Sequence, residues 1–318
     1  MKFLKGRGKL LMCVLGLSIL MTSVGFAQQD YQEQLRKFKE DSIRIYKENQ
    51  EKLKQKEEEE RLNAIKKSIN EGNTFVKTKQ WAQALAAYNK AIEMNSEGFP
   101  KAYYGKGLAL KNLRKPNEAL LAYQKAVELD PSYSEAHLAM AMLYRQLKSY
   151  DYALTACKSA AKTDSTNYKV FYELGTIYNK MKKFNEAAKA FDKVTELDPT
   201  NYRAFEALGV ALENSGDTNG AINAYKKSNG IKESDDVYYR LAALLNKMGR
   251  HQDALAAATR SLELESKKNG KAAFEAGLAS EQLGQYQQAI NYYSRAGQMD
   301  RNWKANADYQ IDMIKRKM

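Results

Sequence analysis

The sequence predicts an all-α fold in which about seven helix–turn–helix units stack into an α–α superhelix, between an N-terminal charged helix and a C-terminal capping helix. The first observation is a period. One pattern of small and large apolar residues recurs seven times between residues 65 and 303, at a spacing of 33 to 35 residues. The units are counted from Ile65, Pro100, Ser134, Tyr168, Tyr202, Asp235 and Gly270. A period of this length is typical of an array of similar supersecondary units.

The second observation is the residue type at three positions of each unit. Position eight is always glycine or alanine: Gly72, Gly107, Ala141, Gly175, Gly209, Ala242 and Gly277. Position twenty is always alanine: Ala84, Ala119, Ala153, Ala187, Ala221, Ala254 and Ala289. Position twenty-four holds an aromatic ring in five units, as Tyr88, Tyr123, Phe191, Tyr225 and Tyr293. Two antiparallel helices approach closely only where side chains are small, so positions eight and twenty mark the helix crossing and the ring fills the space beside it.

The third observation is helical periodicity within each unit. In the unit that begins at Tyr168, apolar residues recur at i, i+3 and i+4 over two segments. Residues 181–185 supply the turn between them, and Pro199 ends the second helix because proline cannot continue it. No unit buries its apolar face alone, so we expect the units to stack with one concave and one convex face.

These offsets resemble the tetratricopeptide repeat, whose W-L-G-Y-A-F-A-P pattern occupies the same positions. The resemblance implies seven units over residues 65–303, at 65–99, 100–133, 134–167, 168–201, 202–234, 235–269 and 270–303. In the fifth unit, residues 214–216 and 228–230 are turn formers and no proline precedes Asp235, which predicts a softer joint. Residues 304–318 continue an apolar stripe and predict a helix that caps the open end of the stack.

The first 27 residues have the three parts of a secretory signal peptide. Basic residues within 2–9 precede an apolar run over 10–26, and small residues stand at 25 and 27. We therefore expect a periplasmic or secreted protein with a cleaved signal. The alternative is a protein anchored in the inner membrane by the uncleaved signal, because about 20 apolar residues can span a bilayer. Cleavage would remove Cys13 and leave Cys157 alone, without an intramolecular disulfide.

Residues 28–64 predict a charged helical spacer or a short coiled coil. From Asp30 to Arg61 the chain carries nine basic and ten acidic residues, and i,i+4 pairs such as Glu33 with Lys37 favour helix. Apolar residues form a stripe along one face of this helix for about two heptads. A sustained coiled coil needs about three or four heptads. Two interpretations stay open: a solvated spacer, and a stalk that forms a homo-oligomer through residues 30–61.

Residues that could carry chemistry are few. His137 and His251 lie apart from any second metal ligand, and no base stands beside Cys157 in the sequence. No nucleotide-binding or hydrolase motif occurs. The formal net charge of +13 is compatible with nucleic acid, but export and the lack of a recognition motif argue against it. We therefore expect no enzyme activity, no catalytic or metal site and no cofactor. We also expect no nucleic-acid partner, and no closer association with a membrane than a location near its surface.

The resemblance implies a concave groove lined by positions two, five, nine and twelve of each first helix. Positions five and nine give the apolar residues Tyr104, Leu108, Leu138, Met142, Tyr172, Tyr239 and Phe274. Position two gives the basic residues Lys101, Lys169 and Arg203. The apolar ladder suits an extended peptide or a partner helix, and the basic residues favour an acidic segment. The alternative is that the rings only cover neighbouring helices.

These features predict a non-enzymatic scaffold or adaptor that is exported to the periplasm and binds a protein partner. A role in a cell-envelope assembly, secretion or motility complex is implied by export and by the resemblance. The alternative function is binding of an anionic small or polymeric ligand, such as cell-wall material, through the basic groove positions. Salt would weaken that binding steeply, whereas it would weaken an aromatic contact little.

Overall fold

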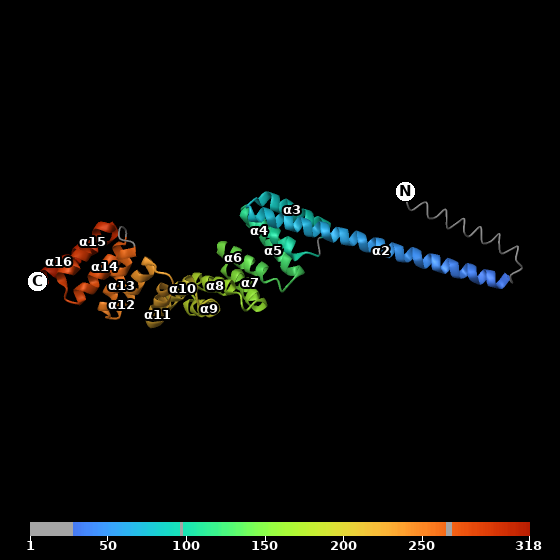
Figure 1. Cartoon of the computed structure of the whole chain (residues 1–318). Helices are drawn as coiled ribbons and strands as arrows, with labels where there is room; N and C mark the ends of the chain where they lie inside the picture. Colours follow the sequence, from blue (N-terminus) through green and yellow to red (C-terminus); the bar gives the residue numbers. More distant parts are fainter. Residues whose placement is uncertain (1–27, 96–97, 265–268) are drawn as a thin grey trace. The chain divides into compact units, whose positions relative to one another are not determined.

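The computed structural model describes residues 28–95, 98–264 and 269–318 (Figure 1). The expected signal peptide and Cys13 lie outside these ranges. The described residues are helical with short turns and contain no strand, which confirms the predicted all-α fold class. No described helix is both long and apolar enough to cross a membrane. The chain divides into two compact units, residues 1–71 and 72–318.

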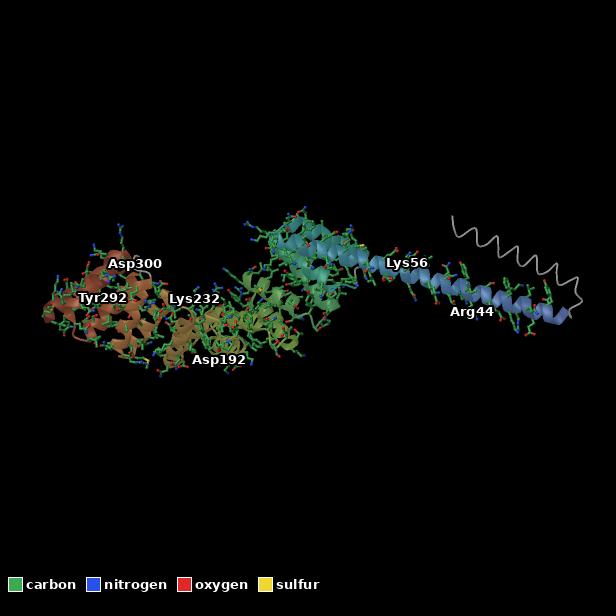
Figure 2. All side chains as sticks on the ribbon, in the orientation of Figure 1. Arg44, Lys56, Asp192, Lys232, Tyr292 and Asp300 are labelled. Carbon is green, nitrogen blue, oxygen red and sulfur yellow. The ribbon has the colours of Figure 1, made fainter. Side chains whose placement is uncertain are left out.

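Helix α2 (Gln28–Lys77) is continuous across the boundary that the sequence placed between residues 64 and 65. Its glutamates, lysines and glutamines are good helix formers, and pairs such as Lys37 with Glu33, at 3.1 Å, are exposed. Figure 2 shows Arg44 and Lys56 projecting from this helix into solvent. Burial begins only at Ile65, which is 0% exposed. The spacer and the first helix of the first repeat are therefore one element rather than two.

The helix pairs of the second compact unit follow the predicted period. The first helices of repeats two to seven are α4 (Pro100–Asn112), α6 (Ser134–Gln146), α8 (Tyr168–Lys180), α10 (Tyr202–Ser215), α12 (Asp235–Lys247) and α14 (Gly270–Gln282). The second helices of the seven repeats are α3 (Trp81–Met94), α5 (Pro116–Leu129), α7 (Tyr150–Thr163), α9 (Phe184–Leu197), α11 (Thr218–Ile231), α13 (His251–Leu264) and α15 (Tyr286–Met299). Each first helix from α4 onward begins at the residue from which its repeat was counted.

The small residue at position eight lies against the ring at position twenty-four. A Cβ atom at Gly107 would lie 2.5 Å from the Tyr123 ring, and one at Gly175 would lie 2.8 Å from the Phe191 ring. Both rings are buried. Glycine is thus required because the ring occupies the space of a side chain, as the sequence predicts.

Every turn within a repeat has a left-handed residue at position fifteen. Four of them are basic residues with φ between 58° and 60°: Lys79, Arg114, Lys148 and Lys182. The last three repeats use glycine instead, at Gly216, Gly249 and Gly284. The sequence identified the turn at 214–216 but gave no sign that basic residues adopt this conformation in the other four repeats.

Residues 228–230 do not form the expected turn. They continue helix α11, and Ser228 is buried, with its hydroxyl donating to the Tyr202 carbonyl at 3.0 Å. The Asn229 side chain accepts from the Ser234 backbone N–H at 3.1 Å, beyond the helix end. These polar side chains satisfy part-buried backbone groups, so the turn expected here is wrong, whereas the softness of the joint stays a prediction.

At three joints between successive repeats, a polar contact links position twelve of one first helix to position six of the next; position six is Gly105 in repeat two and Ala139 in repeat three, where no such contact forms among the described residues. Arg145 of α6 forms an ion pair with Glu173 of α8. Arg240 of α12 contacts Glu213 of α10 at 3.4 Å. Asn246 of α12 donates to the Glu275 carboxylate and carbonyl of α14, both at 2.9 Å. The joint between α8 and α10 lacks this contact, because position six there is Ala207.

Helix α16 (Arg301–Lys317) caps the last repeat and begins three residues before the predicted boundary of 304. Asp300 starts it by accepting a hydrogen bond from the Asn302 backbone N–H at 2.9 Å. Ile314 of this helix is 0% exposed. Lys317 reaches back to Glu281 of α14 at 3.0 Å. The helix covers the apolar surface that an eighth repeat would otherwise cover.

Candidate functional site

The predicted groove residues lie on the first helices, from α4 to α14. The apolar members are all half-buried: Tyr104, Leu108, Leu138, Met142, Tyr172, Tyr239 and Phe274. The basic members are all exposed: Lys101, Lys169 and Arg203. Their assignment to partner binding stays a prediction, but their surroundings differ from repeat to repeat and separate three groups.

In the first group, Tyr104 lies in a cluster of rings. Its centroid is 5.8 Å from that of Tyr123 and 5.3 Å from that of Tyr133. Burial and the nearby carboxylate of Glu135 raise the pKa of Tyr104. Tyr104 and Leu138 also pack against the buried core of repeats two to four. These side chains therefore contribute to the core as well as to the surface.

In the second group, a hollow of about 330 Å³ opens between α8 and α10. We call it the α8/α10 pocket, and its lining residues are Tyr172, Thr176, Asn179, Lys180, Phe191, Arg203, Glu206, Ala207 and Val210. Six of them stand at the groove positions: five, nine and twelve of repeat four, and two, five and nine of repeat five. This pocket is the place where predicted groove residues of two repeats meet around a cavity.

The charges of the α8/α10 pocket differ from those expected from the sequence. Burial, and then the carboxylate of Asp236, raise the pKa of Glu206. Arg203 directs its Nε toward the Tyr202 hydroxyl, at 3.2 Å, and its guanidinium carbon lies 5.7 Å from the centroid of that ring. Burial and the carboxylate of Glu206 raise the pKa of Tyr172. The pocket therefore contains an arginine, Arg203, that already contacts Tyr202, and a half-buried carboxylate, Glu206.

In the third group, the groove positions are already occupied by the chain itself. Phe274 lies 4.6 Å from Trp303 of the capping helix and 5.1 Å from Tyr293, centroid to centroid. The ammonium of Lys271 lies 5.6 Å from the centroid of Tyr239. Phe274 is thus covered by the cap, which the sequence analysis did not foresee.

A second hollow, of about 420 Å³, lies between α11, α12 and α13. Its lining includes Tyr238 and Arg260 and none of the predicted groove residues. Arg260 already pairs with Glu233 and, at 2.6 Å, with Glu263. Tyr238 donates to Glu233 at 2.9 Å. Arg260 and Asp253 of this hollow are therefore satisfied within the chain, the latter by Arg250.

The residues with nucleophilic or metal-binding chemistry are dispersed. Cys157 is 0% exposed, and burial raises the pKa of its thiol to about 12, far above the range in which a thiolate nucleophile forms. His137 contacts the Pro131 carbonyl at 3.1 Å, and His251 contacts the Asn246 side chain at 3.3 Å. Within the described ranges, no group of three or more metal-binding side chains gathers.

Four residues of the α8/α10 pocket that stand at groove positions were not among the predicted site residues: Thr176, Asn179, Glu206 and Val210. The resemblance assigns all four positions to the groove. Applying positions nine and twelve to repeat four would have found the first two. Glu206 stands at position five, where the predicted ladder consists of apolar side chains.

Tetratricopeptide repeat family models match residues 69–112, 100–133, 122–155, 168–201, 202–235 and 239–302. Among curated proteins, the inactive TPR repeat-containing thioredoxin TTL3 of Arabidopsis thaliana is 37% identical over 73 residues. The TPR repeat-containing thioredoxin TTL4 of the same plant is 36% identical over 73 residues. These matches span 23% of this chain, and 10% and 11% of the two relatives.

Several solved structures share the fold. YrrB, described as a TPR protein with an unusual peptide-binding site, has a TM-score of 0.53 and 24% identity, over 58% of this chain and 95% of its own. Pseudomonas aeruginosa pilF has a TM-score of 0.55 and 18% identity, over 65% and 94%. A Parabacteroides merdae tetratricopeptide repeat protein has a TM-score of 0.52 and 17% identity, over 80% and 99%. With family models matched along most of its length, the chain belongs to the tetratricopeptide repeat family.

Proposed function

We propose that this chain is a non-enzymatic adaptor that holds an extended segment or a helix of a partner protein along the first helices of its repeats. The observation that carries the proposal is the α8/α10 pocket, where Tyr172, Asn179 and Glu206 surround a hollow of about 330 Å³. Tetratricopeptide repeats generally serve as scaffolds for protein interaction rather than as enzymes. The peptide-binding site named for YrrB supports the same use of the fold.

The place of action is proposed from the sequence of residues 1–27. We infer export to the periplasm and a role in a cell-envelope assembly, secretion or motility complex, with anchoring by an uncleaved signal as the alternative. Homo-oligomerisation through residues 30–61 belongs to the same proposal. Along this segment Phe38, Ile45 and Leu53 are 40%, 53% and 47% exposed, so a second helix could cover them.

An anionic small or polymeric ligand is the second candidate, because Lys101, Lys169 and Arg203 are all exposed. Salt distinguishes the two. Binding led by these charges weakens steeply between low and physiological ionic strength, whereas a contact led by Tyr172 weakens little. The half-buried carboxylate of Glu206 favours the protein partner, because it would repel an anion at the centre of the groove.

The test is photo-crosslinking in cells from a probe that replaces Tyr172, with mass spectrometry of the adducts. The matched control is the same probe at Tyr152 of α7, a tyrosine that is 68% exposed on a second helix. We expect a dominant envelope protein captured from position 172 and absent from position 152. Equal capture from both positions, or adducts of the chain with itself alone, would overturn the groove proposal.

A further inference from the structure

Glu206 differs from the other buried and half-buried carboxylates of the first helices because it has no hydrogen-bond or ion-pair partner among the described residues. Four others accept a hydrogen bond or ion pair: Glu173 from Arg145, Glu213 from Tyr225 and Arg240, Glu275 from Asn246, and Glu281 from Tyr293 and Lys317. Among the described residues, Glu206 has neither kind of contact. A half-buried carboxylate without a donor retains the cost of its lost hydration.

Ala207 explains why the pocket beside Glu206 is open. In repeats four, six and seven, position six holds Glu173, Arg240 or Glu275, and each of these side chains contacts position twelve of the preceding repeat. The methyl group of Ala207 cannot reach Asn179, so the space between α8 and α10 stays empty. The Asn179 amide consequently has no partner among the described residues.

The remaining lining residues are the apolar Tyr172, Phe191 and Val210, with Thr176 and the exposed Lys180 and Arg203 beside them. The rings of Tyr172 and Phe191 meet edge to face, with centroids 5.4 Å apart, and Val210 lies opposite on α10. Apolar walls beside one carboxylate match the two parts of a long basic side chain, whose aliphatic stem packs on rings while its charged head reaches an acceptor. Arg203 lowers the pKa of Glu206 but forms no ion pair with that carboxylate among the described residues, and its Nε donates to the Tyr202 hydroxyl.

We infer that the α8/α10 pocket is a subsite for one basic side chain, lysine or arginine, of the partner segment. Glu206 accepts hydrogen bonds from its ammonium or guanidinium group, and the stem lies against Tyr172. The Asn179 amide is placed to bond the partner's backbone beside that side chain. The inference rests on the proposed function and reverses, at this subsite, the acidic preference expected from the sequence.

The experiment is selection of a random dodecapeptide library, displayed on phage, against the full chain and its variants. We expect peptides from the wild type to align on one lysine or arginine, and Glu206→Lys to replace it with aspartate or glutamate. A synthetic selected peptide should bind Glu206→Gln about ten-fold more weakly, because a charge-assisted hydrogen bond is lost. Glu186→Gln, which changes an exposed carboxylate of α9, is the matched control and should bind like the wild type.

A second variant, Ala207→Glu, closes the pocket with the residue that position six has in repeats four and seven. It should block the peptide while circular dichroism shows an unchanged helical fold. Selected peptides without a fixed basic residue that still require Tyr172 would overturn the subsite and leave the groove function intact. Peptides indifferent to both Tyr172→Ala and Ala207→Glu, or no selected peptide at all, would overturn both.

Discussion

Two asparagines, Asn179 and Asn246, occupy position twelve of their repeats but differ in their contacts with the next repeat. Asn246 donates to the Glu275 side chain and carbonyl of the next repeat, both at 2.9 Å, and so closes the joint between α12 and α14. Asn179 faces Ala207 across the α8/α10 pocket and has no partner among the described residues. The same residue at the same position stabilises one joint and leaves the other open to a ligand. At these two joints, the outcome depends on position six of the following repeat, which is Glu275 in one and Ala207 in the other.

The largest expected effect compares the rings at position five. Phe274 packs against Tyr293 and Trp303, so Phe274→Ala should lower the free energy of unfolding by about 3 kcal/mol. Tyr172 has one ring partner, Phe191, and packs at the edge of the core cluster around it, so Tyr172→Ala should cost less, about 1 kcal/mol, and abolish binding of a selected peptide. Urea unfolding of both variants measures the difference. Equal losses of stability would mean that Tyr172 is a core residue rather than a groove residue.

The two asparagines give the next largest effect. Asn246→Ala removes the donor to the half-buried Glu275 and should cost about 2 kcal/mol. Asn179→Ala removes no contact within the chain, so it should change stability by less than about 0.5 kcal/mol and weaken peptide binding instead. Thermal unfolding and fluorescence titration of the two variants separate these outcomes. A large loss of stability in Asn179→Ala would show that the α8/α10 joint is closed in solution.

The sequence predicted the repeats well and the joints poorly, for a physical reason. The crossing of two helices depends on residues within one repeat, such as Gly175 and Phe191, and their spacing is visible in the chain. The cover over Phe274 depends on Trp303, which belongs to another helix. The isolation of Glu206 depends on which side chains of two neighbouring helices fail to reach it. Contacts of this kind form between repeats, so they depend on how the repeats stack. Residue spacing within one repeat does not reveal them.

A smaller effect concerns pH and the α8/α10 pocket. Three charged groups affect the pKa of Glu206: Asp236 and Arg240 of α12, and Arg203 of α10. Burial and Asp236 raise this pKa, and the two arginines lower it by less. A bound lysine lowers that pKa again, so affinity is full above the raised pKa and falls as the pH drops through it. The fall should begin above 4.5, the ordinary value, and reach about ten-fold. Glu206→Gln should show no such step in the same titration, and an identical step there would assign the effect to another group.

The smallest effect compares the turns of the middle and C-terminal repeats. Lys182 adopts a left-handed conformation with φ of 58°, whereas the equivalent Gly249 has φ of 74°. A side chain in this region costs about 1 kcal/mol, so Lys182→Gly should gain somewhat less than that, because glycine also loses more entropy on folding. Gly249→Lys should lose a similar amount, since no neighbour lies within 4 Å of the added Cβ and only the backbone conformation opposes it. Chemical unfolding of the two single variants measures both changes in the free energy of unfolding. Changes of the same sign would show that side-chain contacts, rather than backbone conformation, determine the stability of these turns.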